Sequence, residues 1–193
     1  RLIPVAPTDE HNAIGWYRNV EMGMSGLPPY MTDKETNQNW LDQVQEKALE
    51  PDLPIIDSHH HLWDFKAGRV NPRYFLDEIL EDMNSGHNIV ASVFIECAAM
   101  FREDGPEEEK PLGETEFVNG IAAMSASGLY GKTRIAAGIV GTANLELGKP
   151  VADILEKHIE LSGGRFKGIR VGATWDVSPD IINHRTEPRQ CIL

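Results

Sequence analysis

From Leu53 onward, apolar strand-like segments alternate with segments of helical periodicity, and this alternation restricts the fold more than any other feature of the chain. The strand-like segments are short, β-branched and almost continuously apolar, at 54–57, 88–97, 133–141 and 165–171. The helical segments repeat apolar residues at helical spacing, at 74–86, 113–128 and 149–164. Strand starts lie roughly 30–45 residues apart, which is the length of a βαβ unit. The pattern predicts an α/β fold with a parallel sheet, either an open doubly wound sheet or a (β/α)₈ barrel.

Residues 1–53 have a different composition, rich in turn-forming and polar residues. One helix is predicted there, at 36–49, because Trp40 and Val44 belong to a run of apolar residues at helical spacing. We therefore expect 1–53 to be an irregular N-terminal extension and 54–193 to form the α/β domain.

Charge and cysteine content exclude several classes of protein. The 193 residues carry a net charge of -12, which argues against binding to nucleic acid or to an anionic membrane surface. The two cysteines, Cys97 and Cys191, stand in no paired motif, and no apolar run approaches the ~20 residues of a membrane span. These features predict a soluble cytoplasmic protein that binds neither nucleic acid nor membrane.

The stretch "IIDSHHHLWD" places three histidines directly after the first strand. Alternate side chains of a strand face opposite sides, so His59 and His61 should project together and His60 should turn into the packing. Two imidazoles placed in this way are the first ligands that zinc or a similar divalent ion needs. Asp57 shares their parity and is expected to orient a histidine or to reach the metal itself.

This stretch resembles the opening signature of the amidohydrolase superfamily, in its amidohydrolase-related branch of TIM-barrel metal-dependent hydrolases. The match consists of Asp57, His59 and His61, followed by Leu-Trp-Asp at 62–64, and "FKGIR" at 166–170 is similar to the strand-four pattern. The branch includes lactonases and decarboxylases. The resemblance implies a (β/α)₈ TIM barrel and hydrolysis of a lactone or similar cyclic ester or amide. It implies a small-molecule substrate and a divalent metal, with zinc indicated by the ligand type, although some lactonase members work without a metal.

Two further residues are candidates for catalytic roles. Glu96 lies near the end of the second strand, where a carboxylate among apolar residues must find a partner or face the mouth of the site. Arg170 ends the fourth strand, where its planar guanidinium could grip the carboxylate of a carboxylated lactone. A salt bridge from Arg170 to Glu96 or Asp176 is the structural alternative.

The resemblance also implies eight βα units, of which 54–193 supplies about four. We therefore expect this chain to be the N-terminal half of a truncated barrel, with the general base in the later units and with a tendency to self-associate through bare strand edges. Two alternatives to the hydrolase stay open. The first is a decarboxylase on the same barrel, and the second is a non-catalytic metal-binding or interaction domain.

Overall fold

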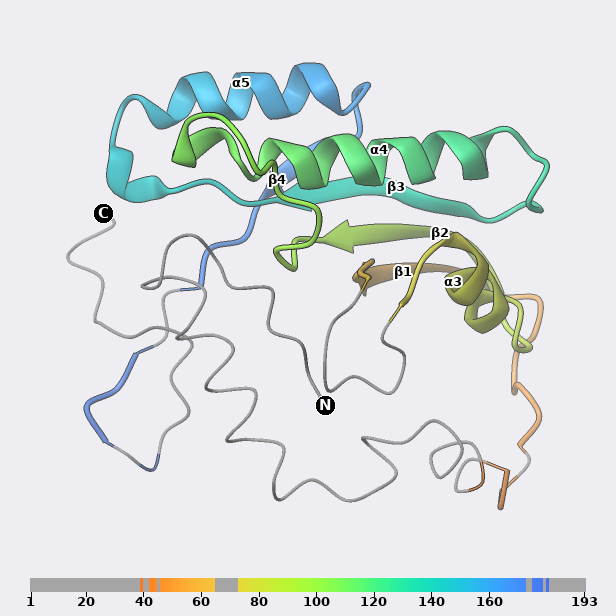
Figure 1. Cartoon of the computed structure of the whole chain (residues 1–193). Helices are drawn as coiled ribbons and strands as arrows, with labels where there is room; N and C mark the ends of the chain where they lie inside the picture. Colours follow the sequence, from red (N-terminus) through yellow and green to blue (C-terminus); the bar gives the residue numbers. More distant parts are fainter. Residues whose placement is uncertain are drawn as a thin grey trace. The chain divides into compact units, whose positions relative to one another are not determined.

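The computed structural model describes residues 39, 42–44, 46–64, 73–172, 175–178 and 180. The chain divides into two compact units, one made of Glu46–Phe65 and Arg73–Val171, the other of Arg1–Gln45, Lys66–Pro72 and Gly172–Leu193. All the helices and strands discussed below belong to the first unit (Figure 1).

Strands and helices alternate along this unit as the sequence predicts. They are β1 (Pro54–His60), α3 (Leu76–Met83), β2 (Asn88–Ile95), α4 (Leu112–Ala126), β3 (Arg134–Gly141), α5 (Val151–Leu161) and β4 (Phe166–Ile169), with 3₁₀ turns η2 (Glu107–Glu109) and η3 (Leu145–Leu147). The four strands form one parallel sheet in the order β1-β2-β3-β4, which confirms the α/β class. In this part of the chain, no helix has the length and apolarity that a membrane crossing requires.

All three helices pack on the same face of the sheet. Phe94, Ile139 and Phe166 are register partners on β2, β3 and β4, and they belong to one core with the apolar residues of α3 and α4. Helix α5 joins this layer beside α4, where His158 stacks on Phe166 with ring centroids 4.9 Å apart. Figure 1 shows α4 and α5 side by side next to β3. The strand order does not reverse within the sheet, so every described helix covers the same side.

The predicted helix at 36–49 is wrong over its described C-terminal part. Asn39 is helical, residues 42–44 and 46–49 are not, and the remaining positions of the predicted helix lie outside the described residues. Leu49 is 97% exposed. A short amphipathic segment gains most of its helical stability by packing its apolar face, and this segment has no such packing at its end.

A buried hydrogen-bond chain joins α4, α5 and the end of β3. Thr115 Oγ1 lies 2.8 Å from His158 Nδ1, and His158 Nε2 lies 3.1 Å from the Thr142 carbonyl oxygen. A carbonyl oxygen only accepts, so Nε2 carries the proton and Nδ1 accepts from the threonine hydroxyl. Burial lowers the pKa of His158 below its ordinary 6.5, since the charged ring would lose its hydration.

We predict that the free energy of unfolding falls as the pH drops below about 6.5 and that His158 contributes to this fall. The unfolded chain binds a proton at His158 more readily than the folded chain, so acid favours unfolding. His158→Gln, whose side-chain amide can still donate to Thr142, should show a smaller pH dependence. Urea unfolding of both proteins between about pH 7.5 and 5.5 measures this, and equal slopes would contradict it.

Candidate active site

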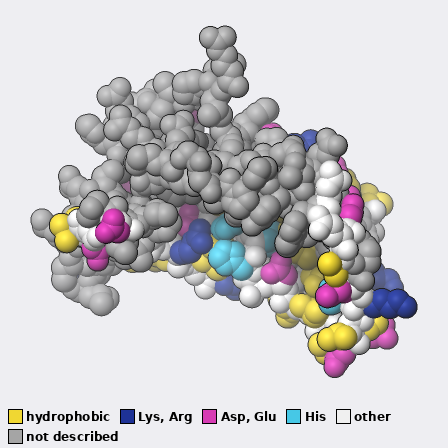
Figure 2. Space-filling model, turned by 90° about the horizontal axis from the view of Figure 1, so that it is seen from below, with side chains coloured by type: hydrophobic (Ala, Val, Ile, Leu, Met, Phe, Trp, Pro, Cys, Tyr) yellow, Lys and Arg dark blue, Asp and Glu magenta, His cyan; other side chains and the backbone are white. Residues whose placement is uncertain are grey.

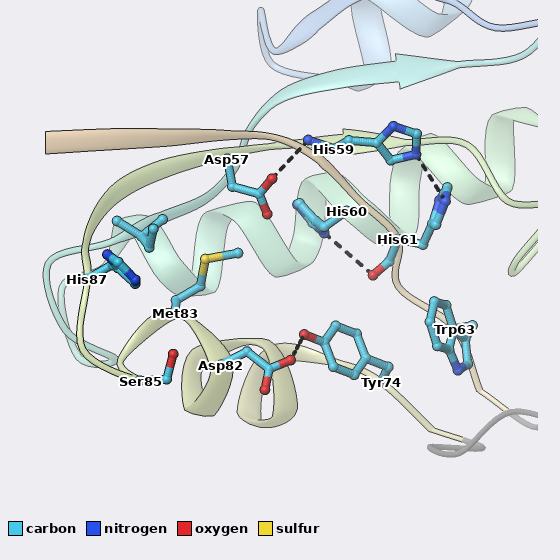
Figure 3. Close-up of a pocket in the computed structure, with 11 residues that line it drawn as sticks. Asp57, His59, His60, His61, Trp63, Tyr74, Asp82, Met83, Ser85 and His87 are labelled. Atoms are coloured by element: carbon cyan, nitrogen blue, oxygen red, sulfur yellow. Dashed lines mark hydrogen bonds between the residues drawn. The ribbon is translucent and has the colours of Figure 1, made fainter. Parts of the chain in front are cut away.

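The C-terminal end of β1 brings together His59, which lies in the strand, and His61, which directly follows it. Their Nε2 atoms are 3.2 Å apart, and the two rings meet edge to face with centroids 4.9 Å apart. Figure 3 shows both rings at the C-terminal end of the strand. The pairing of these two side chains agrees with the alternation expected from the sequence. The position is the edge where parallel α/β proteins place their sites.

His60 points to the other side of β1, into the helix-side core. It is 7% exposed, and its ring meets that of Phe94 edge to face with centroids 5.8 Å apart. Burial lowers the pKa of His60 to about 4, so this ring is neutral at pH 7. The middle histidine therefore packs, as predicted, while its two neighbours face the candidate site.

The ring of His61 is oriented by the neighbouring strand. Its Nδ1 lies 2.8 Å from the carbonyl oxygen of Ile95, the last residue of β2. Because the carbonyl can only accept, Nδ1 carries the proton and Nε2 of the neutral ring presents a lone pair. Nε2 of His59 then donates to that lone pair. Metal-binding histidines commonly have this arrangement, in which the second ring nitrogen is held by a carbonyl group.

The placement of Asp57 differs from the sequence expectation. The pairing of β1 with β2 shifts register between Asp57 and His60, so strict alternation is broken before the histidines. Figure 3 shows the Asp57 carboxylate on the same side of β1 as the His60 ring, opposite the ring of His59. Asp57 Oδ1 accepts a hydrogen bond of 3.1 Å from the backbone N–H of His59. The carboxylate thus supports the backbone of the motif, and the prediction that it shares the parity of the two histidines is wrong.

Glu96 and Arg170 are paired with each other at the same edge of the sheet. Arg170 Nε donates to Glu96 Oε1 over 2.7 Å, and Nη2 donates to the Glu96 carbonyl oxygen over 2.5 Å. Arg170 directly follows β4, and its own N–H is held by the carbonyl of Gly141 at the end of β3. The salt bridge named as the structural alternative is therefore formed. Figure 2 shows histidine side chains gathered with basic and acidic side chains on one face of the molecule.

The His59–His61 pair fits a divalent metal by its geometry. With zinc–nitrogen distances of about 2.0–2.1 Å, a 3.2 Å separation of the two nitrogens corresponds to an angle of roughly 100–105° at the ion, near the tetrahedral value. The same separation also suits the hydrogen bond between the rings. Over the described ranges, no group of three or more His, Cys, Asp or Glu side chains converges to hold an ion. Among the described residues, the pair could therefore offer two nitrogen ligands to an ion.

A pocket of about 400 Å³ opens beside these histidines, between β1 and α3. It is lined by Asp57, His59, His60, His61, Trp63, Tyr74, Asp82, Met83, Ser85, His87 and Ile89. Trp63 and Tyr74 stack with centroids 5.3 Å apart, and the Tyr74 hydroxyl donates to Asp82. Burial is the main effect that raises the pKa of Tyr74, and the Asp82 carboxylate raises it further. The hydroxyl therefore stays protonated.

Sequence reasoning did not identify Tyr74, Asp82 or His87 as neighbours of the motif. Tyr74 begins a short antiparallel bridge to Trp63, and Asp82 lies on α3, eight residues after Tyr74. His87 follows α3 in a loop. Only the packing of α3 against β1 brings these residues to one pocket, and no spacing in the sequence predicts that they lie close together.

Comparison with known proteins adds one relative. No family model matches the chain, and no solved structure matches it. An uncharacterized protein of Sinorhizobium fredii (strain NBRC 101917 / NGR234), y4mH, is 28% identical over 138 residues. The match covers 62% of this chain and 40% of that protein. The chain thus spans well under half the length of this relative.

Proposed function

We propose that this chain is the N-terminal part of a (β/α)₈ hydrolase of the amidohydrolase-related branch, which opens a lactone or a similar cyclic ester. One observation carries the proposal: the Nε2 atoms of His59 and His61 face each other 3.2 Å apart at the C-terminal end of β1. The sequence motif alone predicts the pair, and the hydrogen bond from His61 to Ile95 adds an orienting contact that metal-binding histidines use.

The arrangement of the sheet supports a barrel over an open doubly wound sheet. Doubly wound sheets reverse their strand order and place helices on both faces. Here the order β1-β2-β3-β4 has no reversal, and the described helices share one face, as helices do on the outside of a barrel. The candidate residues follow β1, β2 and β4 at the C-terminal edge, where TIM-barrel enzymes carry their catalytic groups.

The side chains divide the chemistry between them. His59 and His61 would hold a divalent ion, for which zinc fits the ligand type, and such an ion, when bound, would polarise a carbonyl oxygen and acidify water. Arg170 binds a carboxylate of the substrate, and Glu96 keeps the guanidinium turned toward the mouth of the site. Water adds to the lactone carbonyl carbon, the ring C–O bond breaks, and the leaving oxygen takes a proton. The base that deprotonates the water comes from the later βα units.

The test of this function uses the full-length protein that is encoded by the complete reading frame containing this chain. We expect it to hydrolyse carboxylated lactones, and Arg170→Met to lower kcat/KM on them by about 10–100-fold, because a hydrogen bond to a charged group contributes ~1.5–3 kcal/mol. The same variant should leave the hydrolysis of an uncarboxylated lactone nearly unchanged. Arg165→Met is the matched control, since Arg165 lies at the opposite end of β4 and binds Asn119.

Three outcomes would count against parts of this assignment. Equal losses of kcat/KM on the carboxylated and the uncarboxylated lactone would show that Arg170 does not bind the substrate carboxylate. Its role would then be restricted to the salt bridge with Glu96. Release of carbon dioxide without ring opening would favour a decarboxylase on the same scaffold. The absence of turnover on every lactone, with metal still bound, would favour a non-catalytic metal-binding domain.

A further inference from the structure

The turn after β2 contains two non-glycine residues in the left-handed region. Ala98 has a φ of 58° and Met100 a φ of 56°. A side chain with a Cβ atom rarely adopts this conformation, because Cβ then crowds the following carbonyl oxygen. Such residues persist only where surrounding contacts hold them, and they concentrate near functional sites. The contacts of this turn therefore indicate what it positions.

Glu114 of α4 supplies the central contacts. Its side chain is 1% exposed, and Oε1 accepts hydrogen bonds from the N–H groups of Cys97 at 3.0 Å and Ala99 at 2.8 Å. These two amides flank Ala98, so one carboxylate oxygen holds both sides of the left-handed residue. Glu114 is the third residue of α4, where the helix N-terminus favours a negative charge.

Two further contacts restrict the turn. A Cβ atom at Gly113 would lie 2.5 Å from the Met100 carbonyl oxygen and 2.8 Å from the Arg102 nitrogen, so the turn rests directly on the backbone of α4. Cys97 Sγ donates to the carbonyl of Leu62 over 3.3 Å. The turn is therefore fastened to α4 on one side and to the segment directly after His61 on the other.

The turn starts immediately after the two residues that orient the candidate site. Ile95 accepts the Nδ1 proton of His61, and Glu96 binds Arg170 through its side chain and its carbonyl. We propose that Glu114 is a positioning residue which, through the turn at 97–100, sets Ile95 and Glu96 where they orient His61 and Arg170. The importance of Glu114 for catalysis rests on the proposed function, whereas its effect on the orientation of His61 can be measured without catalysis.

The rival interpretation is that Glu114 only stabilises the fold. Ser125 of the same helix provides the matched control. It is also buried, its Oγ donates to the Thr133 carbonyl over 2.8 Å, and it accepts from the Ile135 N–H over 3.0 Å. Ser125→Ala therefore removes two buried side-chain to backbone hydrogen bonds from α4, but at the start of β3, at the opposite edge of the sheet.

The experiment compares wild type, Glu114→Gln, Glu114→Leu and Ser125→Ala. In protein labelled with ¹⁵N-histidine, the ring-nitrogen shifts report the tautomer of His61, and His61→Gln identifies its signals. We expect wild type to hold the Nδ1–H tautomer, Glu114→Gln to hold it less completely, and Glu114→Leu to show mixed tautomers. Ser125→Ala should lose stability yet keep the wild-type tautomer.

Binding of Co²⁺, followed by its absorption spectrum, is the second measurement. Loss of groups that orient metal ligands typically weakens affinity about 10–100-fold, which is the effect we expect for Glu114→Leu and not for Ser125→Ala. Wild-type values for both measurements in Glu114→Leu, or equal changes in Ser125→Ala, would overturn the proposal. If Glu114→Leu does not fold, an unchanged His61 tautomer in Glu114→Gln overturns it. If wild type binds no Co²⁺, the metal part of the proposed function fails and the tautomer comparison still decides.

Discussion

Replacing His59 or His61 with glutamine should remove a divalent ion from the protein, whereas His60→Gln should leave it bound. The two outer rings present Nε2 atoms 3.2 Å apart, and the middle ring lies in the core against Phe94. We expect a fall from about one ion per wild-type chain to almost none in either outer variant, because each removes half of the imidazole ligands. Elemental analysis after dialysis against a weak chelator measures the content.

His60→Gln is the matched control for this experiment, since it makes the same chemical change one residue away. Its circular dichroism spectrum must match wild type, because the replaced ring is buried. Loss of metal from all three variants to the same extent would contradict the assignment of His59 and His61 as ligands. If the wild-type protein contains no metal, His59 and His61 would instead contact the substrate directly.

The 193-residue chain alone should associate into dimers or larger species and should lack lactone hydrolysis. In the described unit, β1 and β4 each pair with a single strand, and the Ile56 side chain on β1 is 62% exposed. Unpaired edges of apolar parallel strands favour pairing with another chain. A four-unit sheet also lacks the side chains that would fill the inner face of a barrel. Light scattering coupled to size-exclusion chromatography, with a lactone assay beside it, measures both expectations.

A charge on the exposed part of β1 should weaken this association. Ile56→Lys should raise the dissociation constant by about tenfold or more, because a buried ammonium group strongly disfavours the paired state. Leu129→Lys is the control, since Leu129 is 87% exposed but lies in the loop before β3. Added salt should strengthen association by screening the net charge of -12. A monomer that hydrolyses lactones would show that four βα units suffice, and would contradict the half-barrel.

The order and type of the elements were readable from the sequence because they depend on local patterns. The apolar runs at 88–97 and 133–141 form β2 and β3 within a few residues of the predicted bounds. Helix α5 ends just before Gly163 and Gly164, which have φ angles of 59° and 84° and stop the helix as the Gly-Gly pair predicts. The extension at 1–53 lies largely outside the described residues.

The sequence by itself determined that His59 and His61 project together and that His60 packs, because the period of two in a strand is a local property. Only the tertiary structure decided the rest of the site. A register shift against β2 turned Asp57 away from its expected side, and the alignment of the ends of β2 and β4 on either side of β3 paired Glu96 with Arg170. These contacts join residues far apart in the chain, so they depend on how strands align and helices pack, which no local spacing encodes.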